Sequence, residues 1–387
     1  MKKIKIAFLS LLATCTIASC DFLEKEPYKI VPENYFQNEA EAQSFLTGIY
    51  SNLGQSTFYG GDYMVLAGGD DLEFYGGSTG RISNTGLICN NTTTSDAAVT
   101  NLWLNLYNGI ERANMFLEQI DNVPGMSDKS RLQYKSEARF LRAFYLFELA
   151  KRYGDIPLIT RTYTQEDINS VRKTSFAEVV DFIAKECTEI TREGGLPEDA
   201  VRGETGRVTK GAALALKSRA LLYAASELHN PGHELKKWEA AAKAAYEVIN
   251  MNKYQLPKIA ADPLYSDLGG NEILKSKQLI FERRATATTS DFESRNEPMG
   301  YEGAEGGNTP TQNLVDAYEM KDGTPFDWNN STHVANMYYD AANKQTRDPR
   351  LYLNVLTNGS MWQKQKVETF EGGKNKVLDG STKTGYY

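Results

Sequence analysis

The chain has 387 residues, of which 41% are hydrophobic and 24% charged, a composition that is typical of a folded protein with a sizeable core. Its 43 basic and 50 acidic side chains give a net charge of −7. No cluster of Lys and Arg is interleaved with aromatic residues, so a nucleic-acid-binding surface is not expected.

The amino terminus has the pattern of a lipoprotein signal peptide. A lysine-rich head precedes an apolar run, residues 6–18, that is too short to span a bilayer. Small residues then lead into Cys20, where a bacterial lipobox places its acylated cysteine. The sequence therefore predicts a signal peptide over residues 1–19 and lipidation of Cys20, which would tether the protein without spanning the membrane. A plain signal peptide without lipidation is the alternative.

Apolar residues recur every three or four positions through the first two-thirds of the mature chain, which predicts amphipathic helices. The expected helices cover residues 39–53, a segment through Leu102–Ile120, and then 130–153, 210–227 and 238–250. Trp103 and Trp238 lie on such helical faces and are expected in the core. Trp328 and Trp362 lie in irregular segments, where they could be exposed.

A further helix is expected to begin at Ser175, which forms a capping box with Glu178. Its apolar stripe includes Cys187, which predicts a buried free thiol at that position. A disulfide between Cys187 and Cys89 is the alternative, because these are the two cysteines outside the signal.

These helices predict a mainly α fold, a tetratricopeptide-like superhelix of helix pairs with long irregular loop insertions. The insertions are expected at residues 54–96 and 283–309. A partial, irregular C-terminal subdomain should follow, with a short helix at 312–320 and short strands around 351–356. We expect an N-terminal region over residues 20–230 and a second region, residues 231–387, that holds the remaining helix pair and the C-terminal subdomain.

Several strings of this sequence resemble the SusD/RagB family. The most specific is the aromatic helix 137–145 that leads into the Arg-Tyr-Gly-Asp-Ile-Pro-Leu exit at 152–158. Further strings that match in the family's order are residues 20–27, 103–114, 206–213, 310–318, 347–350 and 384–387. Family members commonly continue well beyond the last of these strings, so we expect that the chain lacks a C-terminal part.

The resemblance implies an outer-membrane lipoprotein that is paired with a SusC-like TonB-dependent transporter and captures nutrients for it. The ligand would be an oligosaccharide or polysaccharide, or a peptide as in RagB-like members, and neither a cofactor nor catalysis is implied. The acidic residues after Cys20 resemble the surface-export signal of lipoproteins in the Bacteroides group, which favours the outer face of the membrane. The only attachment to the membrane would be the lipid.

The ligand-binding residues are expected in the two insertions, because aromatic rings pack on the C–H faces of sugars while polar side chains bond the hydroxyls. The candidates in the first insertion are Asp71, Phe74, Tyr75 and Arg81, and those in the second are Phe292, Arg295 and Tyr301.

Other motifs do not support catalysis or metal binding. The adjacent carboxyls of Asp70, Asp71 and Glu73 have no assured spacing across a glycosidic bond. The Gly-rich string 76–80 lacks the strand and helix of a nucleophile elbow. His229 and His233 are four residues apart, but Pro231 and Gly232 interrupt the helix that would align them on zinc, so no metal is expected.

Two rival functions remain open. A surface glycoside hydrolase on a helical scaffold predicts the release of reducing ends. A tetratricopeptide adaptor that binds only protein predicts that neither saccharide nor peptide changes the melting temperature.

Overall fold

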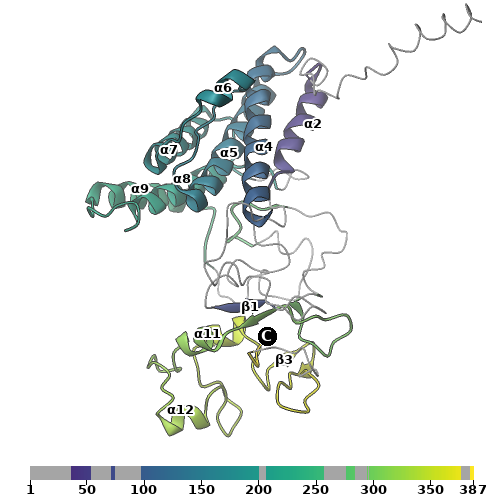
Figure 1. The fold of residues 1–387 in the computed structure, drawn as a ribbon, viewed down its shortest axis with the longest axis vertical. Coiled ribbons are helices and arrows are strands. Elements are labelled where there is room, and N and C mark those ends of the chain that lie inside the picture. The colour runs from purple at the N-terminus through teal and green to yellow at the C-terminus, as the bar shows by residue number, and fades with distance from the viewer. Residues whose placement is uncertain are drawn as a thin grey trace, which may run out of the picture.

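The structure, a computed structural model, describes residues 36–53, 71–74, 97–199, 206–256, 276–283, 294, 296–375 and 384–387. Figure 1 shows the long helices α2 to α9 gathered at one end and the short helices α11 and α12, with β3, at the other. We call helices α2 to α9 the helical array and residues 296–387 the C-terminal part.

Three helices open the helical array. Helix α2 spans Glu39–Tyr50, α4 spans Ala97–Gln119 and α5 spans Asp128–Tyr153. A single 3₁₀ turn, η5 (Ile120–Asn122), and a short loop join α4 to α5, so α5 folds back and packs on α4. The positions predicted for these helices are confirmed, with ends that differ by a few residues.

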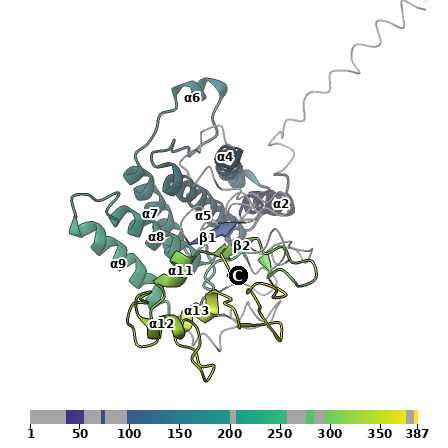
Figure 2. The ribbon, with the colours of Figure 1, turned by 60° about the horizontal axis from the view of Figure 1, so that its bottom comes forward.

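The array continues with α6 (Gln165–Ser170), α7 (Phe176–Glu193), α8 (Lys210–Ala225) and α9 (Leu235–Asn250). Helix α5 packs on α7, α7 on α8, and α8 on α9. Figure 2 shows α7, α8 and α9 in successive positions. This stepwise addition of neighbours is the arrangement of a tetratricopeptide-like array, which confirms the predicted fold class.

The start of α7 is fixed as the sequence predicted. The amide of Glu178 donates to the Ser175 hydroxyl at 3.3 Å, and the amide of Ser175 donates to the Glu178 carboxylate at 3.1 Å. These reciprocal bonds satisfy two amides that the first turn of a helix leaves without partners.

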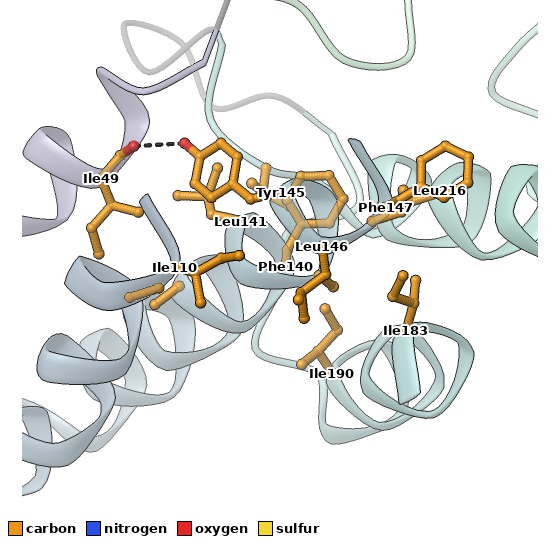
Figure 3. Close-up of a cluster of buried hydrophobic side chains, with 14 of the residues drawn as sticks. Ile49, Ile110, Phe140, Leu141, Tyr145, Leu146, Phe147, Ile183, Ile190 and Leu216 are labelled. Atoms are coloured by element: carbon orange, nitrogen blue, oxygen red, sulfur yellow. Dashed lines mark hydrogen bonds between the residues drawn. The ribbon is translucent and has the colours of Figure 1, made fainter. Parts of the chain in front are cut away.

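One apolar core runs through the array from α2 to α8. The predicted faces of α4 and α5 are buried in it, and Figure 3 shows α5 contributing Phe140, Leu141 and Tyr145. The buried Tyr145 hydroxyl donates to the carbonyl of Ile49 on α2 at 2.7 Å. Cys187 is buried with a free thiol, as predicted, whereas Cys89 lies outside the described residues.

Charged residues of the aromatic helix string also tie the array together. The buried Glu137 carboxylate accepts a hydrogen bond from the Tyr50 hydroxyl at 2.6 Å and forms an ion pair with Arg207 at 2.8 Å. Arg142 donates to Glu186 on α7 at 2.9 Å. Buried ions need such partners, because an unpaired buried charge costs several kcal/mol. The string therefore specifies how α5 joins α2 and α7.

The expectation that Trp238 lies in the core is wrong. Trp238 is 45% exposed, and Tyr246 and Ile249 on the same side of α9 are 60% and 66% exposed. Helix α9 instead turns Ala241 and Ala244 toward the rest of the array. Among the described helices it packs closely on α8, and small side chains allow that close approach. Trp103, in contrast, is partly buried against the core, where it packs on Tyr107 and Tyr153.

The C-terminal part consists of short elements. They are β2 (Asn308–Pro310), α11 (Gln312–Ala317), α12 (Ser331–Ala335), α13 (Pro349–Asn354), β3 (Met361–Trp362) and β4 (Gln365–Lys366). Val315, Leu351, Val355 and Tyr386 form a small apolar cluster. Helix α11 confirms the short helix predicted at 312–320, although it ends three residues earlier.

The strands expected around residues 351–356 are wrong, because this segment lies largely in α13. Asp348 caps the helix by accepting a hydrogen bond from the amide of Arg350 at 2.8 Å, and Pro349 occupies the first turn. A proline at that position costs nothing, since the amide it lacks would have no helical partner. These local signals outweighed the β propensity of Leu351, Tyr352 and Val355.

Arg347 is the largest fully buried side chain of the chain's described part. Its guanidinium donates to the carbonyls of Val315 at 2.8 Å and of Tyr318, and lies 4.3 Å from the centroid of the Phe326 ring. The carbonyls at the end of α11 thus receive the donors that a continued helix would have supplied. Within the described residues, no helix is both long and apolar enough to cross a bilayer.

Candidate functional site

The two predicted insertions meet in a pair of short strands. Strand β1 (Leu72–Phe74) comes from the first insertion and pairs antiparallel with β2 at the end of the second. Leu72 lies opposite Pro310, and Phe74 lies opposite Asn308. The pairing joins residues more than 230 positions apart, so the fold brings together the two segments that the sequence selected as ligand-binding.

Thr311 secures this junction. Its amide and hydroxyl both donate to the carbonyl of Asp71, at 2.9 and 3.2 Å, while the same hydroxyl caps α11 by accepting from the amide of Leu314. The strand pair, the start of α11 and the end of the first insertion therefore form one connected unit. The Asp71 side chain is partly exposed beside it.

A third segment joins the unit from residues 358–375, which contain the β3–β4 hairpin. The Tyr301 hydroxyl donates to the carbonyl of Trp362 at 3.1 Å, and the side-chain amide of Gln363 donates to the Glu297 carboxylate at 2.9 Å. The Asn375 side chain donates to the carbonyl of Met299 at 2.9 Å. We call β1, β2, residues 296–307 and this hairpin the loop face.

Gly300 shows how closely these segments pack. Its φ of +99° lies in the region that favours glycine, and an added Cβ would stand 2.3 Å from the carbonyl oxygen of Lys374. The backbone before Tyr301 is therefore held against the hairpin segment, which positions the ring that follows.

Tyr301 is partly exposed on the loop face with its hydroxyl engaged. Partial burial, and then the neighbouring Glu297 carboxylate, raise the pKa of Tyr301. Met361 on β3 is 59% exposed and Phe370 is 55% exposed. These segments thus expose apolar side chains as well as the polar Gln363, a combination that suits a ligand with both C–H and hydroxyl groups.

The structure places three of the seven predicted ligand-binding residues. Tyr301 lies on the loop face, Asp71 directly precedes β1, and the backbone of Phe74 forms the end of β1. Four others, Tyr75, Arg81, Phe292 and Arg295, lie outside the described residues, as does the predicted lipidation site Cys20. The assignment of all seven to a binding site stays a prediction.

The hairpin residues and the exposed ring of Trp328 did not appear among the predicted ligand contacts. Trp328 is 50% exposed, as the sequence suggested, and its indole nitrogen donates to Asp316 at 2.7 Å. Trp362 is partly buried, and its indole nitrogen has no partner in the described part of the chain. The irregular surroundings of both tryptophans were the one available signal in the sequence.

The described residues contain no group of three His, Cys, Asp or Glu side chains that could hold a metal ion. The ring of His229 stacks on Phe176, with centroids 3.6 Å apart and planes 6° from parallel. Burial is the main cause that lowers the pKa of His229. The ring has a packing role at the junction of α7 with the end of α8.

The fold defines a class of protein, a tetratricopeptide-like helical array whose long insertions meet in a loop face. Residues 21–222 match a family described as "Starch-binding associating with outer membrane", and residues 276–387 match the SusD family. The chain belongs to the SusD/RagB family.

Curated relatives come from Formosa agariphila. Its SusD-like protein P25 is 23% identical over 262 residues, which cover 65% of this chain and 46% of that protein. Its SusD-like protein P2 is 31% identical over 192 residues, which cover 47% of this chain and 36% of that protein. The chain therefore spans about half, or less, of the length of the curated relatives it matches.

Solved structures share the fold over most of the chain. A SusD-like protein from Bacteroides fragilis is 26% identical, has a TM-score of 0.72, and is matched over 91% of this chain and 68% of its own. A second B. fragilis protein, a SusD-like carbohydrate-binding protein, is 23% identical with a TM-score of 0.72, over 91% of this chain and 67% of its own.

Proposed function

We propose that the protein captures a carbohydrate at the cell surface on its loop face, without catalysis. The observation that carries this proposal is the pairing of β1 with β2, which unites the two aromatic-bearing insertions. The description of the family as starch-binding, and the carbohydrate-binding relative from B. fragilis, support the class of ligand.

The chemistry of the loop face fits a sugar. The Tyr301 ring can pack against the C–H face of a pyranose, and Gln363 and Asp71 can bond hydroxyls nearby. Because the Tyr301 hydroxyl is engaged by the backbone of Trp362, its ring is held in place before the ligand arrives. A preorganised ring loses little conformational entropy on binding.

We further propose that Cys20 is acylated, that the protein stands on the outer face of the outer membrane, and that it passes its ligand to a SusC-like TonB-dependent transporter. The family's described association with the outer membrane supports this location. Labelled palmitate should enter the wild-type protein in cells. A Cys20→Ala variant that is labelled equally would refute the anchor.

Carbohydrate capture is tested with purified protein that begins at Asp21, by gel retardation and calorimetry against plant, host and microbial polysaccharides. Tyr301→Ala should weaken binding about tenfold or more, since the loss of one stacking ring and its buried area is worth about 1–2 kcal/mol. Tyr301→Phe keeps the ring and loses only the hydrogen bond, so it should retain most of the affinity. Tyr246→Ala, at an exposed tyrosine of α9, is the matched control.

Each other outcome identifies a rival. Binding that Tyr246→Ala and Tyr301→Ala weaken equally would place the site away from the loop face. Binding of peptides in place of glycans would support a RagB-like function. Release of reducing ends that Asp71→Asn abolishes would establish a hydrolase. If neither a glycan nor a peptide binds, the remaining function is that of an adaptor that binds only protein.

A further inference from the structure

A cavity of about 650 Å³ is lined mainly by residues of α5 and α8, none of its lining residues belongs to the loop face, and the proposed function does not use it. Helix α5 contributes Phe140, Phe144 and Phe147 at helical spacing to its lining, and α8 contributes Ala212, Leu216 and Arg219. Residues 278–281 complete the lining. Binding sites for small molecules have this size and a largely apolar lining.

Four of the lining residues are phenylalanines, three from α5 and Phe281 from the distant segment. The Phe281 ring stands edge-on to Phe140 and Phe144, with centroids 5.2 and 6.2 Å away. Phe147 meets Tyr223 edge-on at 5.3 Å. These rings offer an apolar surface for the body of a ligand.

The charged side chains of the lining differ in whether they have a partner of opposite charge. Glu148, whose side chain is 5% exposed, is already paired with Lys151 at 2.6 Å and with Arg152 at 2.5 Å. Arg219 and Arg283 also line the cavity, and neither meets a carboxylate in the part of the chain that the structure describes. Within the described residues, the lining therefore carries two guanidinium groups without a carboxylate partner.

We propose that this cavity binds a monocarboxylic acid with an apolar, preferably aromatic, body. The phenyl or alkyl body lies among Phe140, Phe144 and Phe281, and the carboxylate pairs with Arg219 and Arg283. Guanidinium groups suit this task because their planar donors match the two oxygens of a carboxylate. A free small acid and the carboxyl terminus of a peptide ending in Phe share this chemistry.

The test is calorimetry on the chain from Asp21 onward with phenylbutyrate, the uncharged phenylbutanol and the cationic phenylbutylamine. These probes share a body and differ in the charge of the head group. We expect phenylbutyrate to bind roughly tenfold more tightly than phenylbutanol, with an advantage that shrinks in high salt. Phenylbutylamine should bind most weakly.

Substitutions assign the roles. Arg219→Gln and Arg283→Gln should each reduce the preference for the acid over the alcohol, whereas Phe281→Ala should weaken both probes alike. Arg172→Gln is the matched control, because Arg172 is exposed before α7 and bonds only backbone carbonyls in the described part of the chain. Melting temperatures of all variants show that each remains folded.

Equal affinity for acid and alcohol, an unchanged preference in both arginine variants, or no binding of any probe would overturn the proposal. A peptide that ends in Phe with a free carboxylate, compared with its amidated form, identifies the source of the ligand. If the free peptide binds more tightly than phenylbutyrate, the natural ligand is a chain terminus. Binding of phenylbutyrate alone indicates a free acid. A glycan that fits the loop face should leave both affinities unchanged, which separates this site from the proposed function.

Discussion

The helical array and the C-terminal part are held together in different ways. The array buries long apolar stripes in a continuous core from α2 to α8, with ion pairs such as Arg207–Glu137 between its helices. The C-terminal part has a small cluster around Val315 and depends on hydrogen bonds to backbone carbonyls, above all those of Arg347. An apolar core tolerates hydrophobic substitutions that conserve volume, whereas a network of buried polar groups loses stability when any one partner is removed.

The difference in core size should appear as a difference in local opening. Two variants compare the two parts. A Cys89→Ser variant keeps Cys187, which is buried in the array, and a Cys89→Ser, Cys187→Ser, Val355→Cys variant places a thiol in the smaller cluster. We expect thiol labelling at pH 8 of native Cys187 to be at least about a thousandfold slower than in denaturant, and faster at position 355. Equal rates in the two parts would remove the distinction.

The same thiol predicts a pH dependence. Burial raises the pKa of Cys187 from 9.0 to about 12. The unfolded thiol ionises first, so this contribution to stability is fully present below about pH 8.5 and is lost as pH rises toward 12. Cys187→Ala should remove the part of the alkaline loss that this thiol causes, measured as the free energy of unfolding across that range.

Arg347→Met should cost about 3–5 kcal/mol, because it removes the buried guanidinium that donates to the carbonyls of Val315 and Tyr318 and packs on the Phe326 ring. Hydrogen exchange should report the loss in α11 and α13, with the array protected. Arg350→Met is the control from the same string, since the Arg350 side chain is exposed and pairs with Asp348, and it should cost less than about 1 kcal/mol. Similar losses for both variants would contradict the role of the buried guanidinium.

Gly109→Ala tests packing inside the array. An added Cβ would stand 2.6 Å from a ring carbon of Tyr145, so overpacking should cost about 1–3 kcal/mol in chemical denaturation. At Gly48 on α2, an added Cβ would stand 4.0 Å from a guanidinium nitrogen of Arg112, so Gly48→Ala should stabilise the protein by about 0.5–1 kcal/mol. The two substitutions are chemically identical, so an effect of the same sign would refute the packing argument.

Helix caps should give the smallest effect, and a similar one in both parts. Ser175→Ala removes the capping box of α7 and should cost about 1 kcal/mol. Thr311→Ala removes the cap of α11 and also a bond to Asp71, so it should cost slightly more. A Thr311→Ser variant keeps both bonds and should remain close to wild type in thermal melting.

Local signals predicted much of the array. The period of the apolar residues located α4 and α5, and the capping box fixed the start of α7, because both depend on residues within one or two turns. The strings that resemble the SusD/RagB family also indicated the fold class. The same reasoning failed for α9, since which side of a helix is buried depends on what packs against it, and the partner of α9 buries Ala241 in place of Trp238.

For the candidate site, the sequence by itself determined which insertions hold aromatic and polar residues, and composition was enough for that. Only the tertiary structure decided that the first insertion reaches the second through β1 and β2, and that Tyr301 joins the hairpin at Trp362. Pairing between segments hundreds of residues apart leaves no periodic trace in either segment, because a three-residue strand is too short to show one. The cavity beside Phe281 likewise exists only where α5, α8 and a distant segment meet.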